Sequence, residues 1–330
     1  MKTPTLAAGL LITTALGAAA ETRQLTIHAY DSFANNAGPG IAEGFAAICD
    51  CEIEIIGVGS SGDVLPGLIA AAPGDRPDLV LGIDTNNVAA ARDSGLFAPH
   101  GRALPPLDMP IAWDDPQFLP YNWGHYAFIY DGETVQTPPA SFEDLIASDL
   151  RVVIQDPQSS TTGLGLLMWV EAAFGDEAGD IWQALAARDE TQVVPRWADA
   201  YHPIFRAGDA DAVLSYATSP AYHVIMEDED GPRAARFDEG HYVRIEVAGL
   251  LADASEPDLA RAFLDFMFTD AFQSVIPTTR WLYPVVTPAE GLPEAFGDLI
   301  DPGAALLFPA EEAAARREAA LERWRAAFGE

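Results

Sequence analysis

The segment Ser215–Tyr222 holds the side chains whose types and spacing are best suited to binding a small molecule. It reads Ser-Tyr-Ala-Thr-Ser-Pro-Ala-Tyr, and the apolar run before it predicts a buried strand over 212–215. Ser219 is expected to be the N-cap of a following helix, with Pro220 as its first residue. The turn would therefore present tyrosine rings and hydroxyls at the carboxyl end of a strand, where open α/β sheets bind ligands.

Two tryptophans stand at similar junctions, outside the apolar runs. Trp197 precedes a predicted helix, and Trp281 lies between a predicted helix and a proline-containing segment. A single tryptophan in such a place more often packs than stacks on a ligand, but Tyr216 and Tyr222 are further candidates for the same surface. A cation over a desolvated aromatic face gains about 2 kcal/mol. The four rings together predict an aromatic clamp for a flat, cationic ligand.

Carboxylates and hydroxyls follow other predicted strands. Asp31 and Asp84 come at the ends of the first and third strands. They would balance a cationic ligand, or they are turn-forming aspartates that bond their own backbone. Ser160 and Thr161 precede a predicted helix, whose first N–H groups and dipole favour a phosphate or carboxylate. Simple helix capping by either hydroxyl is the alternative.

Signals of catalysis are missing from the sequence. It contains no Gly-x-Ser-x-Gly elbow, no His-Glu-x-x-His helix and no P-loop lysine, and its histidines are scattered. A binding protein without a cofactor or bound metal is therefore expected, rather than an enzyme. Two close tyrosines with a carboxylate could also hold ferric iron, so a metal carrier remains an alternative.

The first twenty residues predict a signal peptide. Lys2 precedes an apolar run over 6–16, and three alanines at 18–20 form a cleavage site. The run is too short to span a bilayer. Export to a bacterial periplasm is the simplest interpretation.

The charge balance is strongly acidic. The 330 residues include 50 Asp and Glu against 18 Lys and Arg, a net charge of −32, and Lys2 is the only lysine. Such a field repels nucleic acid and anionic membranes and attracts cations. The acidic residues are scattered, so a surface that only maintains solubility is the alternative explanation.

The two cysteines, Cys49 and Cys51, are separated by one residue. In an oxidising compartment they can form a structural disulfide, although so small a ring needs particular backbone angles. Free thiols and redox catalysis are the other two interpretations.

Strands alternate with helices along the chain, which predicts an α/β protein built from βαβ units with a parallel sheet. The strands are expected over 24–30, 52–57, 78–83, 123–130, 152–155, 192–194, 212–215 and 241–251, with a loop over 31–40 after the first of them. The mature length exceeds what one core usually supports, so two lobes are expected. A proline-rich stretch over 99–122 is predicted to lead out of the first lobe. The expected division is lobe 1 over 21–120 and 248–330 and lobe 2 over 121–247. The last helix, about 309–328, is expected to pack across the first lobe.

Several short motifs, in one unbroken order along nearly the whole mature chain, resemble a known family. They are Tyr-Asp-Ser-Phe at 30–33, Gly-Pro-Gly at 38–40, Cys-Asp-Cys at 49–51, Leu-Gly-Ile-Asp at 81–84, Gln-Asp-Pro at 155–157, Thr-Gly-Leu-Gly-Leu-Leu at 162–167, the 215–222 octet, Glu-Gly-His-Tyr at 239–242 and Trp-Leu-Tyr-Pro-Val at 281–285. Together they resemble the thiamine-binding periplasmic proteins of bacterial ABC importers. The resemblance implies a two-lobed, class II periplasmic-binding-protein fold, each lobe a mixed sheet flanked by helices, with the ligand in the inter-lobe cleft.

The resemblance also implies roles for individual residues toward thiamine or its mono- or diphosphate. Tyr222, Trp281 and Trp197 would contact the rings, with Tyr216 alongside and Tyr30 in the cleft. Ser160 and Thr161 would face the hydroxyethyl or phosphate end, with the Gly62 loop opposite. The chain reads Ser60-Ser61-Gly62 where an acidic residue is expected before the glycine, so the preference among phosphorylated forms stays open.

The partners implied are thiamine, a membrane permease and its cytoplasmic ATPase, with the protein acting as a monomer. An exported thiamine-degrading enzyme is a rival of another class, and it would need an activated nucleophile such as a cysteine.

Overall fold

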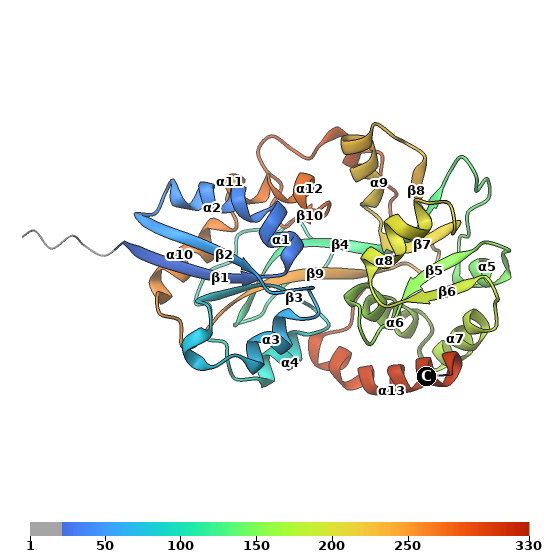
Figure 1. The fold of residues 1–330 in the computed structure, drawn as a ribbon, viewed down its shortest axis with the longest axis horizontal. Helices are drawn as coiled ribbons and strands as arrows, with labels where there is room; N and C mark the ends of the chain where they lie inside the picture. The colour runs from blue at the N-terminus through green and yellow to red at the C-terminus, as the bar shows by residue number, and fades with distance from the viewer. Residues whose placement is uncertain (1–21, 330) are drawn as a thin grey trace, which may run out of the picture.

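The computed structural model describes residues 22–329, and the predicted signal peptide lies outside the described residues. Two lobes lie side by side, and the long strands β4 (Phe118–Asp131) and β9 (His241–Leu250) run through both (Figure 1). Each lobe has its own large hydrophobic cluster. Both strands contribute side chains to each cluster, so they tie the two cores together.

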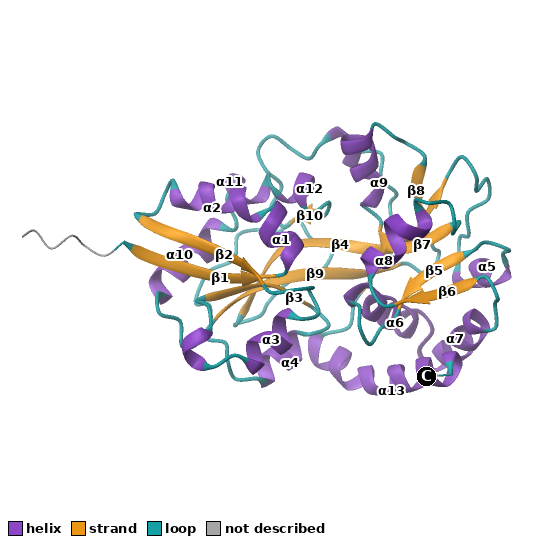
Figure 2. Ribbon diagram, in the orientation of Figure 1, coloured by secondary structure: helices purple, strands orange, loops and turns teal. Residues whose placement is uncertain are grey.

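The first lobe is a mixed sheet in the order β2-β1-β3-β9-β4. β1 (Arg23–Ala29) lies parallel to β2 (Cys51–Gly57) and β3 (Leu79–Asp84), whereas β9 runs antiparallel to β3 and β4. Helices flank this sheet in Figure 2. They are α1 (Asp31–Asn36), α2 (Gly38–Ala46), α3 (Val64–Ala70), α4 (Val88–Asp93), α10 (Pro257–Phe266), α11 (Asp270–Gln273) and α12 (Ile276–Thr279).

The second lobe continues from β4 in the order β4-β7-β5-β6. β7 (Ala212–Tyr216) is antiparallel to β4, and β5 (Val152–Gln155) is parallel to both β7 and β6 (Thr191–Val194). Its other elements are α5 (Phe142–Ala147), α6 (Thr161–Phe174), α7 (Ala178–Ala186), α8 (Trp197–Ala200), α9 (Ser219–Tyr222) and β8 (Pro232–Ala234). Short strands β10 (Tyr283–Pro284) and β11 (Ala305–Leu306) add to β4 and β9.

The predicted strands are present, but two segments differ from the expectation. Residues 31–40, expected to be a loop, form α1 and the start of α2, because Pro39 lies in the first turn of α2, where its missing N–H costs nothing. β4 begins inside the proline-rich stretch, and Pro120 is tolerated there at a register shift against β9. The predicted lobe boundaries at 120 and 247 fall within β4 and β9.

The prediction that the last helix packs across the first lobe is wrong for all four of its buried side chains. In α13 (Ala310–Phe328), Ala313, Ala320, Leu321 and Trp324 belong to the second lobe's cluster. Trp324 packs edge-on against Trp182 of α7 at 4.8 Å. Figure 1 shows α13 beginning near α4 and running beneath the second lobe toward α7.

A disulfide joins Cys49 and Cys51 between α2 and β2, with the Cα atoms 5.2 Å apart. Among residues 22–329, the helices are all too short or too polar to cross a bilayer.

Candidate ligand-binding site

A cavity of about 530 Å³ lies between the two lobes. The first lobe contributes Tyr30, the loop 59–62 and residues 279–282, and the second contributes 159–162, Trp197 and part of the 215–222 octet. Both lobes therefore line one cavity, which is large enough for a small organic molecule.

Four aromatic residues predicted from the sequence line this cavity: Trp197, Tyr216, Tyr222 and Trp281. Trp281 meets Tyr222 edge to face at 5.1 Å, and Trp197 stacks on Tyr201 at 4.8 Å. Tyr216 stacks on Tyr126, which is buried behind it, at 5.3 Å. Each of these rings is therefore held in place by a neighbouring aromatic side chain.

The serines of the octet support Trp197 instead of capping a helix. The indole N–H of Trp197 donates to Ser215 Oγ at 2.9 Å, and Ser215 Oγ lies 2.8 Å from Ser219 Oγ. Ser219 lines the cavity but is the first residue of α9, whose N-cap is Thr218, so the predicted N-cap role is wrong. Ser219 Oγ accepts the N–H of Tyr216 at 3.3 Å, which takes the hydroxyl away from its own helix.

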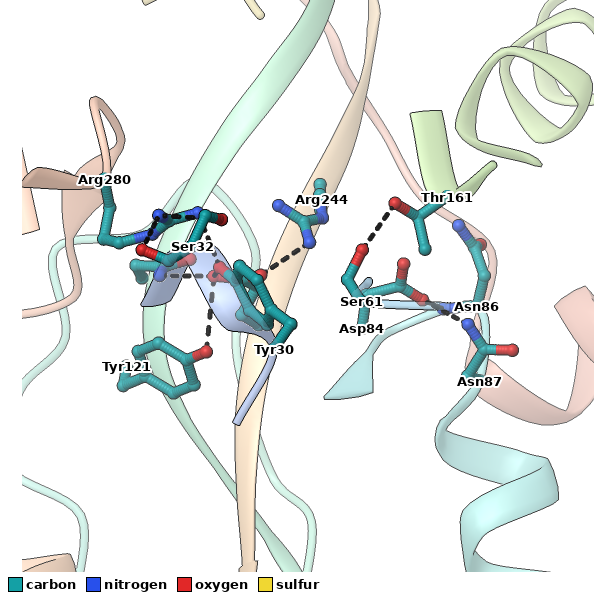
Figure 3. Close-up of polar contacts among 12 residues, drawn as sticks. Tyr30, Ser32, Ser61, Asp84, Asn86, Asn87, Tyr121, Thr161, Arg244 and Arg280 are labelled. Atoms are coloured by element: carbon teal, nitrogen blue, oxygen red, sulfur yellow. Dashed lines mark hydrogen bonds and ion pairs between the residues drawn. The ribbon is translucent and has the colours of Figure 1, made fainter. Parts of the chain in front are cut away.

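Ser160 and Thr161 both line the cavity at the start of α6. Ser160 is the N-cap and accepts the N–H of Gly163 at 3.4 Å, so capping occupies part of its bonding capacity. Thr161 Oγ1 lies 2.9 Å from Ser61 Oγ of the first lobe, and the two side chains point toward one another in Figure 3. The Gly62 loop therefore faces α6 directly across the cleft.

The two predicted carboxylates have different places. Asp31 lines the cavity, and its Oδ1 accepts the N–H of Gly59 at 2.9 Å. Asp84 is buried and is not among the lining residues; its Oδ1 accepts from Asn86 N and Asn87 Nδ2 (Figure 3). Burial raises the pKa of Asp84. Its alternative interpretation as a turn-forming aspartate fits the structure, and the expected placement at the ligand does not.

A buried charged network beneath the cavity was missed from the sequence. Glu246, on β9, accepts from Arg244 Nη2 at 2.5 Å, Tyr30 OH at 2.9 Å and Asn122 Nδ2 at 2.6 Å. Arg280 Nη2 donates to Tyr30 OH at 2.8 Å (Figure 3). Burial alone would raise the pKa of Glu246, but the neighbouring guanidinium groups bring it below its ordinary value. Alternating charges within the apolar strand Val-Arg-Ile-Glu-Val are the signal that could have revealed it.

Candidate metal ligands gather behind the clamp. His223, Glu227 and Glu229 are close enough to share an ion. Arg206 pairs with both carboxylates, at 3.2 and 2.6 Å, and His223 Nε2 lies 2.8 Å from Tyr201 OH. The Arg206 guanidinium therefore already supplies the positive charge that a metal ion would bring to these two carboxylates.

The disulfide-bonded cysteines are not among the residues that line the cavity. A thiol nucleophile at the cleft, which the degrading-enzyme alternative needs, therefore has no candidate in the described part of the chain.

Residues 16–278 match the family of bacterial extracellular solute-binding proteins. This chain belongs to that family. It is a solute-binding protein rather than an enzyme. It is 42% identical over 307 residues to the thiamine-binding periplasmic protein of Escherichia coli (strain K12), covering 92% of this chain and 93% of the relative. The counterpart from Brucella abortus biovar 1 (strain 9-941) is 40% identical over 308 residues, 92% of each chain.

Solved structures agree with the two-lobed fold predicted from the sequence. A periplasmic thiamin binding protein superposes with a TM-score of 0.86 at 41% identity, over 93% of this chain and 96% of the other. A ferric binding protein from Campylobacter jejuni has a TM-score of 0.75 at 15% identity, over 92% of this chain and 99% of the other. The second likeness shows the fold alone. The predicted fold class is confirmed.

Proposed function

We propose that this solute-binding protein captures thiamine in the inter-lobe cleft and delivers it to a membrane permease driven by a cytoplasmic ATPase. The observation that carries the proposal is the convergence of four aromatic side chains from both lobes on one cavity. It is supported by 42% identity to a relative named for thiamine binding.

The chemistry of thiamine fits the lining residues. Its thiazolium is a flat cation for the faces of Trp197, Tyr222 and Trp281, with Tyr216 alongside. The hydroxyethyl tail, or a phosphate attached to it, would face Ser160, Thr161 and the loop at Gly62, where the start of α6 favours negative charge. Because lining residues come from both lobes, ligand binding would favour the closed state.

The site of action would be the periplasm, after cleavage of the signal peptide at residue 20. Relatives named periplasmic support this placement. The protein would act as a monomer. It would have no nucleic-acid partner, because its acidic charge balance repels nucleic acid.

Titration calorimetry with the mature protein tests the proposal. Thiamine is expected to bind with at least micromolar affinity, about −8 kcal/mol. Absence of detectable heat would reject thiamine as the ligand. Mass spectrometry of the co-purified ligand separates thiamine from its mono- and diphosphate. A visible phenolate band on adding ferric iron would instead favour the metal-carrier alternative.

Trp281→Ala and Tyr222→Ala should each weaken thiamine binding more than tenfold. Each loses a stacking face, and tenfold corresponds to about 1.4 kcal/mol. Calorimetry on the two variants measures the effect. Tyr130→Ala is the matched control, because Tyr130 is half-buried in the second lobe and outside the cavity lining. Wild-type affinity in both cavity variants would place the site elsewhere.

A further inference from the structure

Trp281 has an unusual backbone. Its φ is +56°, and the only other non-glycine residue of the described chain with a positive φ is Asp228. The left-handed region is unfavourable for a bulky L-residue, because its Cβ crowds the backbone. Trp281 follows α12 by two residues, where a helix end usually places glycine. A tryptophan in this place keeps its conformation only if its surroundings enforce it.

The chain on both sides of Trp281 is fixed in the first lobe. Before it, Arg280 N donates to Ile276 O at 2.9 Å, closing α12. After it, Leu282 is 2% exposed in the hydrophobic cluster of the first lobe. Leu282 packs so closely on Gly124 that a Cβ atom added to Gly124 would lie 2.6 Å from Leu282 Cδ2. Tyr283 then pairs with Trp123 of β4. These contacts hold the neighbours of Trp281, but none of them is a hydrogen bond to the Trp281 carbonyl.

The Trp281 carbonyl is bonded from the second lobe. Thr218 Oγ1 donates to it at 2.6 Å. Thr218 is wholly buried at the N-cap position of α9, yet its side chain makes no cap hydrogen bond. The hydroxyl is therefore committed to a residue 63 positions away. Four residues after Thr218, Tyr222 meets the Trp281 ring edge to face.

We propose that Thr218 is a positioning residue for ligand binding: its hydroxyl holds Trp281 in the left-handed conformation that places the indole against Tyr222 in the cavity. The bond also joins a loop of the second lobe to the backbone of the first. It thereby couples the assembly of the aromatic clamp to the approach of the two lobes. The identity of the ligand in this inference rests on the proposed function. The role of Thr218 in the conformation of Trp281 does not.

The test compares Thr218→Val, which keeps the shape and β-branching but loses the hydroxyl, with Thr218→Ser, which keeps the hydroxyl. Thr218→Val leaves the Trp281 carbonyl without its donor, and about tenfold weaker thiamine binding is expected, mainly through faster release in stopped-flow fluorescence. Thr218→Ser should stay within about twofold of wild type. Thr134→Val is the matched control, because the Thr134 hydroxyl also bonds a carbonyl, that of Asp131, on the exposed surface.

A ligand-free measurement separates this inference from the proposed function. Amide hydrogen exchange over 280–283 should be faster in Thr218→Val than in wild type, with other segments unchanged. Unchanged exchange, or a general loss of thermal stability with wild-type affinity, would overturn the positioning role. If wild-type protein fails to bind thiamine, the proposed function falls, and the exchange result alone decides the role of Thr218.

Discussion

Glu246→Gln is expected to lower the free energy of unfolding by about 3–5 kcal/mol. Glu246 is fully buried and lies 2.5 Å from Arg244, which is 4% exposed. Neutralising the carboxylate leaves a guanidinium in the interior without its counter-charge, and the cost of an unpaired buried charge far exceeds that of a lost surface pair. The new amide NH₂ would also face groups that donate, among them Tyr30 OH and Asn122 Nδ2.

Urea unfolding at pH 7 measures this loss. Glu318→Gln is the matched control: Glu318 pairs with Arg325 at 3.1 Å and its side chain is 72% exposed, so a change of about 0–1 kcal/mol is expected. A loss below about 1 kcal/mol for Glu246→Gln would mean that Arg244 does not depend on this carboxylate.

Local sequence patterns predicted the strands, and they selected four aromatic residues that the structure places along the cavity. Strands such as 152–155 are apolar runs bounded by turn residues, and the resulting β5 has the predicted bounds. Trp197, Tyr216, Tyr222 and Trp281 could be selected because they stand at the ends of elements, where the fold exposes side chains to the cleft. Such signals lie within a few residues, so they are readable without tertiary structure.

The errors concern polar side chains whose hydrogen-bond partners or burial a local rule does not identify. Ser219 looked like an N-cap, yet its hydroxyl bonds Ser215, and the N-cap Thr218 donates to Trp281. A local rule identifies a hydroxyl near a helix start but not a competing acceptor 63 residues later. Asp84 had two local interpretations, and its burial, which the sequence pattern does not show, decides for the one in which it bonds Asn86 and Asn87.

The packing of α13 shows the same limit for a whole helix. Its composition predicts a helix over 309–328, and the helix is present. The surface that it covers depends on which lobe offers a complementary face. Here Glu171 of the second lobe, wholly buried, is paired with Arg323. Helix propensity contains no information about that partner.

Two buried histidines, His125 and His241, are expected to make the protein less stable in acid. His241 Nδ1 lies 2.7 Å from the Tyr126 carbonyl and must donate to it, whereas its Nε2 accepts the N–H of Phe237 at 2.9 Å. If Nε2 were also protonated, its N–H would point at the N–H of Phe237, which is itself a donor. Neither ring nitrogen of His125 has a hydrogen-bond partner among residues 22–329, and the residue is 4% exposed. Burial lowers the pKa of each from 6.5 to about 4, and for His125 the neighbouring His241 adds to the effect.

Stability should therefore fall as the pH drops from about 6.5 to about 4. In the unfolded chain each histidine binds a proton below about pH 6.5, whereas in the folded protein the ring stays neutral down to about pH 4. Unfolding therefore takes up protons between these two pH values. Above pH 6.5 the full stability is present, and each histidine removes about 3 kcal/mol by pH 4. His125→Leu deletes one titrating ring without breaking a hydrogen bond, so it should retain stability at pH 7 and show a shallower slope between pH 5 and 6.5. Urea midpoints across this range measure the slope, with His202→Gln, an exposed histidine, as control. An unchanged slope in His125→Leu would show that His125 takes up its proton equally in the folded and unfolded chain.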